Sequence, residues 1–160
     1  MARPSIRVRR AWPSTQSVVA LEGADFACAY EVDISPEDGR SPEQWARAAW
    51  EDSPSALRWF MRTGWRFVLG FRLGPRASPD HILGWPIVDR PPDEVVCRLR
   101  SGLLDAHNTF RRLDGVLVWS TFVRYEKPMA RLVWMPASVL HRHIVRLALR
   151  RAAVRPIQDS

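Results

Sequence analysis

The chain has 160 residues, of which 46% are hydrophobic and eight are tryptophan. This composition is typical of one folded domain with a substantial core and excludes a disordered chain. Its formal net charge is +7, a balance that favours anionic partners such as nucleic acid or acidic lipid. Acidic residues are nevertheless interspersed from Glu22 to Glu126, so a generally solvated surface is the preferred interpretation of the charge.

The N-terminal residues contain no apolar run of signal-peptide length, and no segment is long and apolar enough to span a membrane. We therefore expect a cytoplasmic protein. In that reducing compartment, Cys28 and Cys97 are expected to be two buried thiols rather than a disulfide. The expected organisation is a basic arm at residues 1–20, a single domain at 21–155 and a tail at 156–160.

The basic arm holds four arginines and no acid. Arg7 and Arg9 alternate with apolar residues, so the arm is either a short edge strand or a loose segment. Residues 26–33 also alternate, which predicts a strand with one buried face. A turn at 35–39 follows, because Ser, Pro, Asp and Gly cluster there.

Two helices are predicted next. Ser41 is a helix cap, Pro42 suits the first turn, and Gln44 completes a capping box, so a helix begins here and runs to about residue 51. A second helix begins near Pro54 and carries apolar residues at core spacing up to Gly70, which closes this helical section.

From residue 81 onwards the period changes to two, and five strand-like runs follow one another at 82–89, 94–100, 103–111, 116–125 and 130–134. Asp114-Gly115 indicates a hairpin between the third and the fourth. The run at 116–125 is apolar on both parities, so we expect both of its faces to be covered, or one of them to line a cavity.

The last predicted element is a long helix at 136–153. Pro136 suits its first turn and Ser138 is a candidate cap. One face is expected to be apolar and to close the sheet, with residues Leu140, Ile144, Leu147 and Ala148.

These elements predict an α+β fold in which an antiparallel sheet of about six or seven strands curves around the long C-terminal helix, with two short helices after the first strand. A helix that lies across a curved sheet leaves a space beneath it, and small apolar ligands bind in such spaces.

Several short motifs resemble a bacterial family of uncharacterised domains within the START-like, polyketide-cyclase (SRPBCC, helix-grip) superfamily. They are Trp45-Ala46-Arg47-Ala48-Ala49, Pro92-Asp93-Glu94-Val95-Val96, Leu104-Asp105, Thr121-x-Val123-Arg124, Arg131 ahead of Pro136, His141-Arg142-x-Ile144-Val145, and Leu149-Arg150-Arg151-Ala152-Ala153. The resemblance spans roughly residues 25–153. It implies the helix-grip fold and a ligand cavity, and it implies no catalytic residue.

No established catalytic motif is present, and we predict no metal and no cofactor. Asp105 and His107 alternate on one strand face and are weak candidates for an acid/base couple, although a solvated polar face explains them better. His141 and His143 are two residues apart on a helix and point in opposite directions, so they cannot share a metal ion. His141, near the edge of the apolar face, is a third weak catalytic candidate.

The favoured function is binding of a small hydrophobic or amphipathic molecule between the sheet and the last helix. The expected pocket residues are Tyr30, Trp85, Leu99, Phe110, Trp119, Val123, Trp134 and Leu140. Two arginine stripes at i, i+4, i+8 suggest the alternative of an anionic partner, either nucleic acid or acidic membrane: Arg58, Arg62, Arg66 and Arg142, Arg146, Arg150. A cyclase- or hydrolase-like enzyme is the third hypothesis.

Overall fold

The computed structural model describes residues 6–155, so the predicted tail at 156–160 and the first five residues of the arm lie outside it. An open antiparallel sheet has the strand order β1-β2-β8-β7-β6-β5-β4-β3. Its strands are β1 (Val8–Ala11), β2 (Phe26–Asp33), β3 (Ala77–Ser78), β4 (His81–Ile82), β5 (Trp85–Asp89), β6 (Glu94–Arg100), β7 (Leu104–Leu113) and β8 (Val116–Tyr125). The eight strands within residues 6–155 exceed the expected six or seven. A hairpin at Leu83-Gly84 divides the predicted run 82–89 between β4 and β5, and the short strand β3 pairs with β4.

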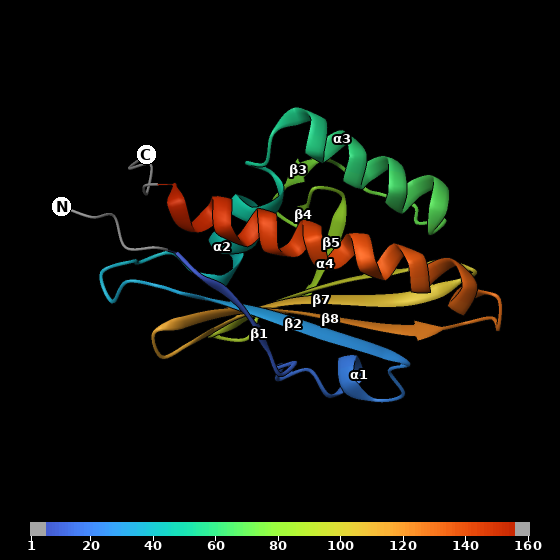
Figure 1. Ribbon diagram of the computed structural model, residues 1–160, viewed down its shortest axis with the longest axis horizontal. Coiled ribbons are helices and arrows are strands. Elements are labelled where there is room, and N and C mark those ends of the chain that lie inside the picture. Colours follow the sequence, from blue (N-terminus) through green and yellow to red (C-terminus); the bar gives the residue numbers. More distant parts are fainter. Residues whose placement is uncertain (1–5, 156–160) are drawn as a thin grey trace.

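Helices cover the sheet in two unequal layers (Figure 1). Helices α2 (Pro42–Trp50), α3 (Ser55–Thr63) and α4 (Ala130–Val154) lie on one side, with α4 running across the sheet. The short helix α1 (Val18–Leu21) lies on the other side. The predicted α+β class, with two short helices after the strand at 26–33 and a long final helix, is therefore confirmed.

Residues after the edge strand β1 cover the second face of the sheet. Ser14 exchanges hydrogen bonds with Ser120, its backbone N–H donating to Oγ at 2.9 Å, and the N–H of Gln16 donates to the Glu94 carboxylate at 2.8 Å. The side chains of Asp105 and His107 on that face are buried. The expectation of a solvated polar face was wrong, because the N-terminal segment returns across it.

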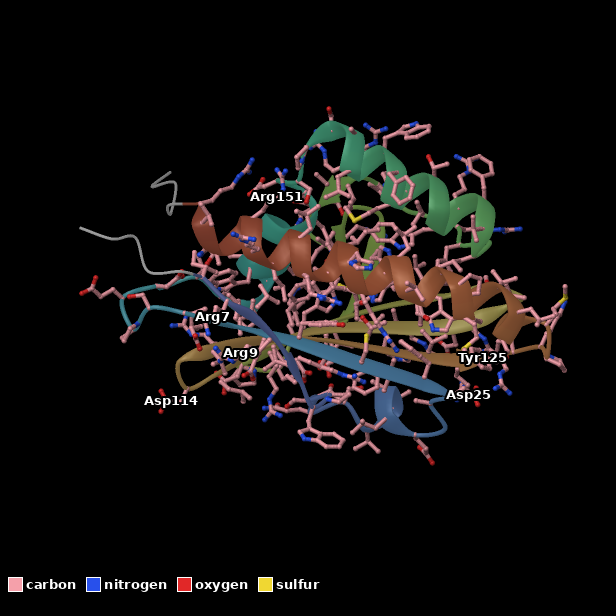
Figure 2. All side chains as sticks on the ribbon, viewed as in Figure 1. Arg7, Arg9, Asp25, Asp114, Tyr125 and Arg151 are labelled. Carbon is pink, nitrogen blue, oxygen red and sulfur yellow. The ribbon has the colours of Figure 1, made fainter. Side chains whose placement is uncertain are left out.

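The central strands are long and in regular register. The β7–β8 hairpin turns at Asp114-Gly115 as predicted, with Leu113 paired to Val116 and Gly115 at a φ of 73°. Figure 2 shows Asp114 at one end of the sheet and Tyr125 with Asp25 at the other. The Tyr125 N–H donates to the Asp25 carboxylate at 2.7 Å, which joins the end of β8 to the segment before β2.

Helix α4 is longer than predicted because it begins at Ala130 rather than at Pro136. The predicted strand at 130–134 was wrong: Ala130, Trp134 and Ser138 are buried at spacings of four, which is a helical stripe. Pro136 lies inside the helix, and Ser138 is not a cap, since its hydroxyl donates to the Met135 carbonyl at 2.7 Å.

The apolar face of α4 also differs from the prediction. Leu140 and Leu147 are 46% and 43% exposed, and of the four predicted residues only Ala148 is fully buried. A different stripe of α4, which the prediction did not identify, is buried against the rest of the fold: Ala130, Trp134, Val145, Ala148, Leu149 and Ala152.

The predicted start of helix α2 and the predicted end of the helical section at Gly70 are confirmed. Helix α2 has the predicted capping box, in which the Ser41 hydroxyl accepts from the Gln44 N–H at 3.1 Å and the Gln44 side chain accepts from the Ser41 N–H at 2.8 Å. Helix α3 continues directly into a π-helical turn, η1 (Gly64–Val68), and Gly70 at a φ of 72° ends it. Cys28 and Cys97 are buried free thiols, as expected, and burial raises their pKa to about 11 and about 12.

Candidate functional site

An apolar cleft of about 340 Å³ lies between the α3–η1 segment, helix α4 and the middle of the sheet. Only Asn108 of β7 and Trp119 of β8 reach it from the sheet, and α2 contributes Trp50. Its volume falls within the range of small-molecule sites. The remaining residues of the wall belong to the two long helical segments and their continuation: Trp59, Phe60, Met61, Thr63, Gly64, Trp65, Phe67, Val68, Leu69, Trp134, Ala137, Leu140, His141 and Ile144.

The π turn shapes one side of this apolar cleft. At η1 the Leu69 N–H donates to the Gly64 carbonyl, five residues earlier, at 3.1 Å. This turn therefore contains one residue more than the hydrogen-bonded turn of an α-helix. Phe67 and Val68 are consequently exposed while Leu69 is buried. Such turns frequently occur at functional sites, and here the turn keeps aromatic groups at the opening of the cleft.

Four side chains at the base of the apolar cleft form one hydrogen-bond network. The Trp119 indole N–H donates to the Asn108 side-chain oxygen at 2.9 Å, and the Thr121 hydroxyl donates to the same oxygen at 2.8 Å. Since the Thr121 proton is used there, Thr121 must accept from His141, whose Nε2 lies 2.9 Å away.

This network determines which ring nitrogen of His141 carries the hydrogen. Its Nε2 carries the hydrogen, so in the neutral ring Nδ1 is an acceptor. Burial, together with the nearby positive charge of Arg142, lowers the pKa of His141 to about 4, so the ring is neutral at pH 7. Asn108 retains an amide donor that no described side chain or carbonyl accepts. The base of the apolar cleft thus offers one spare donor at Asn108 and one spare acceptor at His141. The indole N–H groups of Trp50 and Trp134, in the same wall, are buried without a partner among the described residues.

Three of the predicted pocket residues line the apolar cleft, namely Trp119, Trp134 and Leu140. The other five belong to the core and not to the wall: Tyr30, Trp85, Leu99, Phe110 and Val123. The correction has a simple cause. The prediction placed the space directly between sheet and C-terminal helix, whereas buried small residues such as Ala148 and Ala152 allow close packing at that end of the helix.

Sequence reasoning missed the contribution of α3–η1 and of Trp50. The Trp50 ring lies 5.7 Å from that of Trp119 and 5.5 Å from that of Trp65, in tilted or edge-on arrangements. The spacing of aromatic residues from Trp59 to Phe67 was a visible signal. Its interpretation as core spacing could not distinguish a cleft wall from a filled interior.

The catalytic candidates are not brought together. Asp105 and His107 lie on the face of the sheet that the N-terminal segment covers, whereas His141 contacts Thr121 on the α4 face. Burial raises the pKa of Asp105, but the hydrogen bonds from Arg98 together with the neighbouring charges, chiefly those of Arg98 and Arg124, outweigh burial and leave the pKa below its usual value. Burial lowers the pKa of His107. This pair is an ionised carboxylate held by two arginines beside a neutral ring.

Histidines 141 and 143 point apart, as predicted: His141 faces the apolar cleft and His143 is exposed. Among residues 6–155, no three His, Cys, Asp or Glu side chains are grouped so as to hold a metal ion. Within the same range, no helix combines the length and the apolar composition that crossing a bilayer demands.

The two arginine stripes lie on different parts of the molecule. Arg58, Arg62 and Arg66 line a second cavity of about 380 Å³ with Arg76, which we call the arginine groove. Arg142 and Arg146 lie instead over the rings of Phe26 and Tyr30, at 5.5 and 5.3 Å from the ring centres, beside strand β2. Arg150 is exposed on the same helix. The stripes therefore do not form one surface.

Fold and site together define an α+β protein with an open antiparallel sheet, a long C-terminal helix and an apolar cleft beneath its helical layer. No family model and no curated protein matches the sequence. A solved protein from Rhodobacter sphaeroides is similar at 16% identity, with 92% of this chain and 96% of that chain covered and a TM-score of 0.43. A protein of unknown function from Pseudomonas aeruginosa is similar at 13% identity, with 89% and 82% covered and a TM-score of 0.25.

Proposed function

We propose that this protein is a START-like, helix-grip protein that binds a small hydrophobic or amphipathic molecule in the apolar cleft. The observation that carries the proposal is the cleft itself, whose wall is made mainly of aromatic and aliphatic side chains. Its polar members are Asn108 and His141 at the base and Thr63 on the side shared with the arginine groove. Binding sites for small molecules commonly combine an apolar wall with a few fixed polar groups.

The polar pair narrows the class of ligand. Asn108 offers an amide donor, and neutral His141 offers an acceptor at Nδ1. A hydroxyl group both accepts and donates, so an apolar molecule with one hydroxyl satisfies both residues. A carboxylate satisfies only the donor and loses its hydration beside a neutral wall, which is costly. We therefore expect an uncharged polar end on an apolar body.

A neutral fluorophore, N-phenyl-1-naphthylamine, tests whether the cleft binds apolar molecules. We expect saturable binding with one site per chain. Leu140→Arg should weaken it at least tenfold, because the new side chain puts a charge at the cleft wall. Leu147→Arg is the matched control: Leu147 lies two turns along the same helix, is equally exposed and is not part of the wall. Unsaturable binding, or equal binding by both variants, would contradict the proposal.

A pair of ligands tests the role of the polar residues. 1-Naphthol should displace the fluorophore at a lower concentration than naphthalene does, because one net hydrogen bond contributes about 1 kcal/mol, or about fivefold in Kd. Equal displacement would show that the hydroxyl is not recognised. Mass spectrometry of protein purified under native conditions from its own host would then identify a retained ligand directly.

A further inference from the structure

The α3–η1 segment exposes aromatic side chains along its outer ridge. Trp59 is 67% exposed and Phe67 is 75% exposed, and Phe60 and Val68 beside them are exposed as well. Monomeric soluble proteins seldom leave a contiguous group of large apolar side chains uncovered unless a partner covers it. Trp59, Thr63 and Phe67 line both cavities, so this ridge separates the apolar cleft from the arginine groove.

The arginine groove beside the ridge is strongly cationic. Arg58 donates to the Glu51 carbonyl at 2.8 Å and Arg62 to the Leu83 carbonyl at 3.0 Å, so both are held by backbone rather than by acids. Arg66 and Arg76 are exposed. Within residues 6–155, none of these four has a carboxylate at ion-pair distance.

The groove contains one acid, and that acid is already engaged. The Glu51 carboxylate accepts from Arg47 at 2.9 Å and from the Leu83 N–H at 3.4 Å. Burial lowers the pKa of Arg62, and the charges of Arg76 and Arg66 lower it further. The like charges thus repel one another across the groove, and a negatively charged surface would relieve that repulsion.

Exposed tryptophan and phenylalanine with flanking arginines form the pattern that suits the boundary between lipid headgroups and acyl chains. A nucleic acid would also satisfy the arginines and stack on Trp59. Val68, Phe60 and the open apolar cleft next to them, however, match acyl chains and not phosphodiesters. We propose that the α3–η1 ridge and the arginine groove dock the protein on an anionic bilayer, with arginines on headgroup phosphates and Trp59 and Phe67 among the upper acyl carbons.

Docking in this orientation places the apolar cleft at the bilayer, because the ridge residues are also cleft residues. An apolar ligand could then move between bilayer and cleft without crossing water. The docking does not depend on ligand binding, since it uses exposed side chains. Fluorophore binding without vesicles tests the cleft, and vesicle binding without ligand tests the ridge, so the two ideas can fail separately.

Co-sedimentation of the full chain with phosphatidylcholine vesicles, with and without phosphatidylglycerol, measures the docking. We expect binding only when phosphatidylglycerol is present, and weaker binding at high salt. The double variant R66Q/R76Q should bind about 25-fold more weakly, from about fivefold per arginine near an anionic surface. R146Q/R150Q is the matched control, because it removes the same two charges from another part of the molecule. Equal weakening by both would overturn the proposal in favour of diffuse attraction.

Lipid chains brominated near the headgroup test the orientation. We expect such vesicles to quench tryptophan fluorescence in the wild type, and the quenching to be largely lost in W59F, whose exposed ring lies outside the core. Quenching unchanged in W59F would refute the orientation. Displacement from vesicles by millimolar glycerol phosphate, or by single-stranded DNA at micromolar concentration, would also overturn the proposal, because the groove would then be a site for free anions or for nucleic acid.

Discussion

The stability of the folded protein should depend on pH through His141. Folding lowers the pKa of this ring from its ordinary 6.5 to about 4. Between these two values the unfolded chain binds a proton at His141 that the folded chain does not bind. The free energy of unfolding therefore falls as the pH falls from 6.5 towards 4, and it is fully retained above pH 6.5.

The magnitude follows from the width of that window. Each pKa unit corresponds to 1.36 kcal/mol, so the full difference amounts to about 3 kcal/mol. A single domain is stable by roughly 5–15 kcal/mol, which makes this loss a large share of the total. The contribution of His107 has the same sign, because burial lowers its pKa too.

Urea denaturation at pH 7 and at pH 4.5, followed by circular dichroism, measures the loss. His141→Gln keeps an amide donor for Thr121 and cannot titrate, so its loss between the two pH values should be smaller than that of the wild type by most of the 3 kcal/mol. His143→Gln, two residues along the same helix and exposed, should lose as much as the wild type. If His141→Gln and the wild type lose equal stability, His141 is not the half-buried neutral ring that its cleft position and its Thr121 contact imply.

Two further substitutions test other features by urea denaturation at pH 7. Gly84→Ala should destabilise the fold by about 1–3 kcal/mol, because a Cβ at a φ of 94° is strained and would lie 2.7 Å from the Arg62 guanidinium. Gly39→Ala, with open space around it, should be near neutral. Equal effects of the two substitutions would contradict this reasoning. Asp105→Asn should lower the free energy of unfolding by about 1.5–3 kcal/mol, since that carboxylate is 1% exposed and accepts from two arginines. Asn in place of the exposed Asp33 should have no measurable effect. The reverse order would refute the importance of the Asp105 ion pairs.

Local chemistry was predictable from the sequence. Ser41, Pro42 and Gln44 build a cap from groups within four residues, and Asp114-Gly115 forms a hairpin turn in which Gly115 takes a positive φ that glycine adopts without strain. The strand pattern between residues 94 and 125 was equally informative, because alternation along a strand reflects the sheet directly. These elements depend on neighbours in sequence, and the chain itself supplies those neighbours.

The failures concern contacts between distant segments. Asp105 and His107 looked solvated because nothing near them in sequence indicates that Ser14 and Gln16 cross that face. Pro136 looked like a helix start because a proline inside a helix normally costs about 3 kcal/mol. Trp134 is buried against the sheet, and such packing of the first turns compensates for the lost hydrogen bond. Tertiary contacts thus decided both features.

The apolar cleft could not be predicted either, because the sequence does not show which aromatic residues of the α3–η1 segment line it. Aromatic residues at helical spacing fill a core or line a cavity equally well, and that spacing does not reveal the π turn at Gly64–Val68, where Phe67 and Val68 are exposed. The α3–η1 segment has the apolar cleft on one side of Trp59, Thr63 and Phe67 and the arginine groove on the other. One short segment therefore separates two environments of opposite character. The anionic bilayer proposed above has both an apolar and an anionic part, and a segment with these two sides can contact both at once.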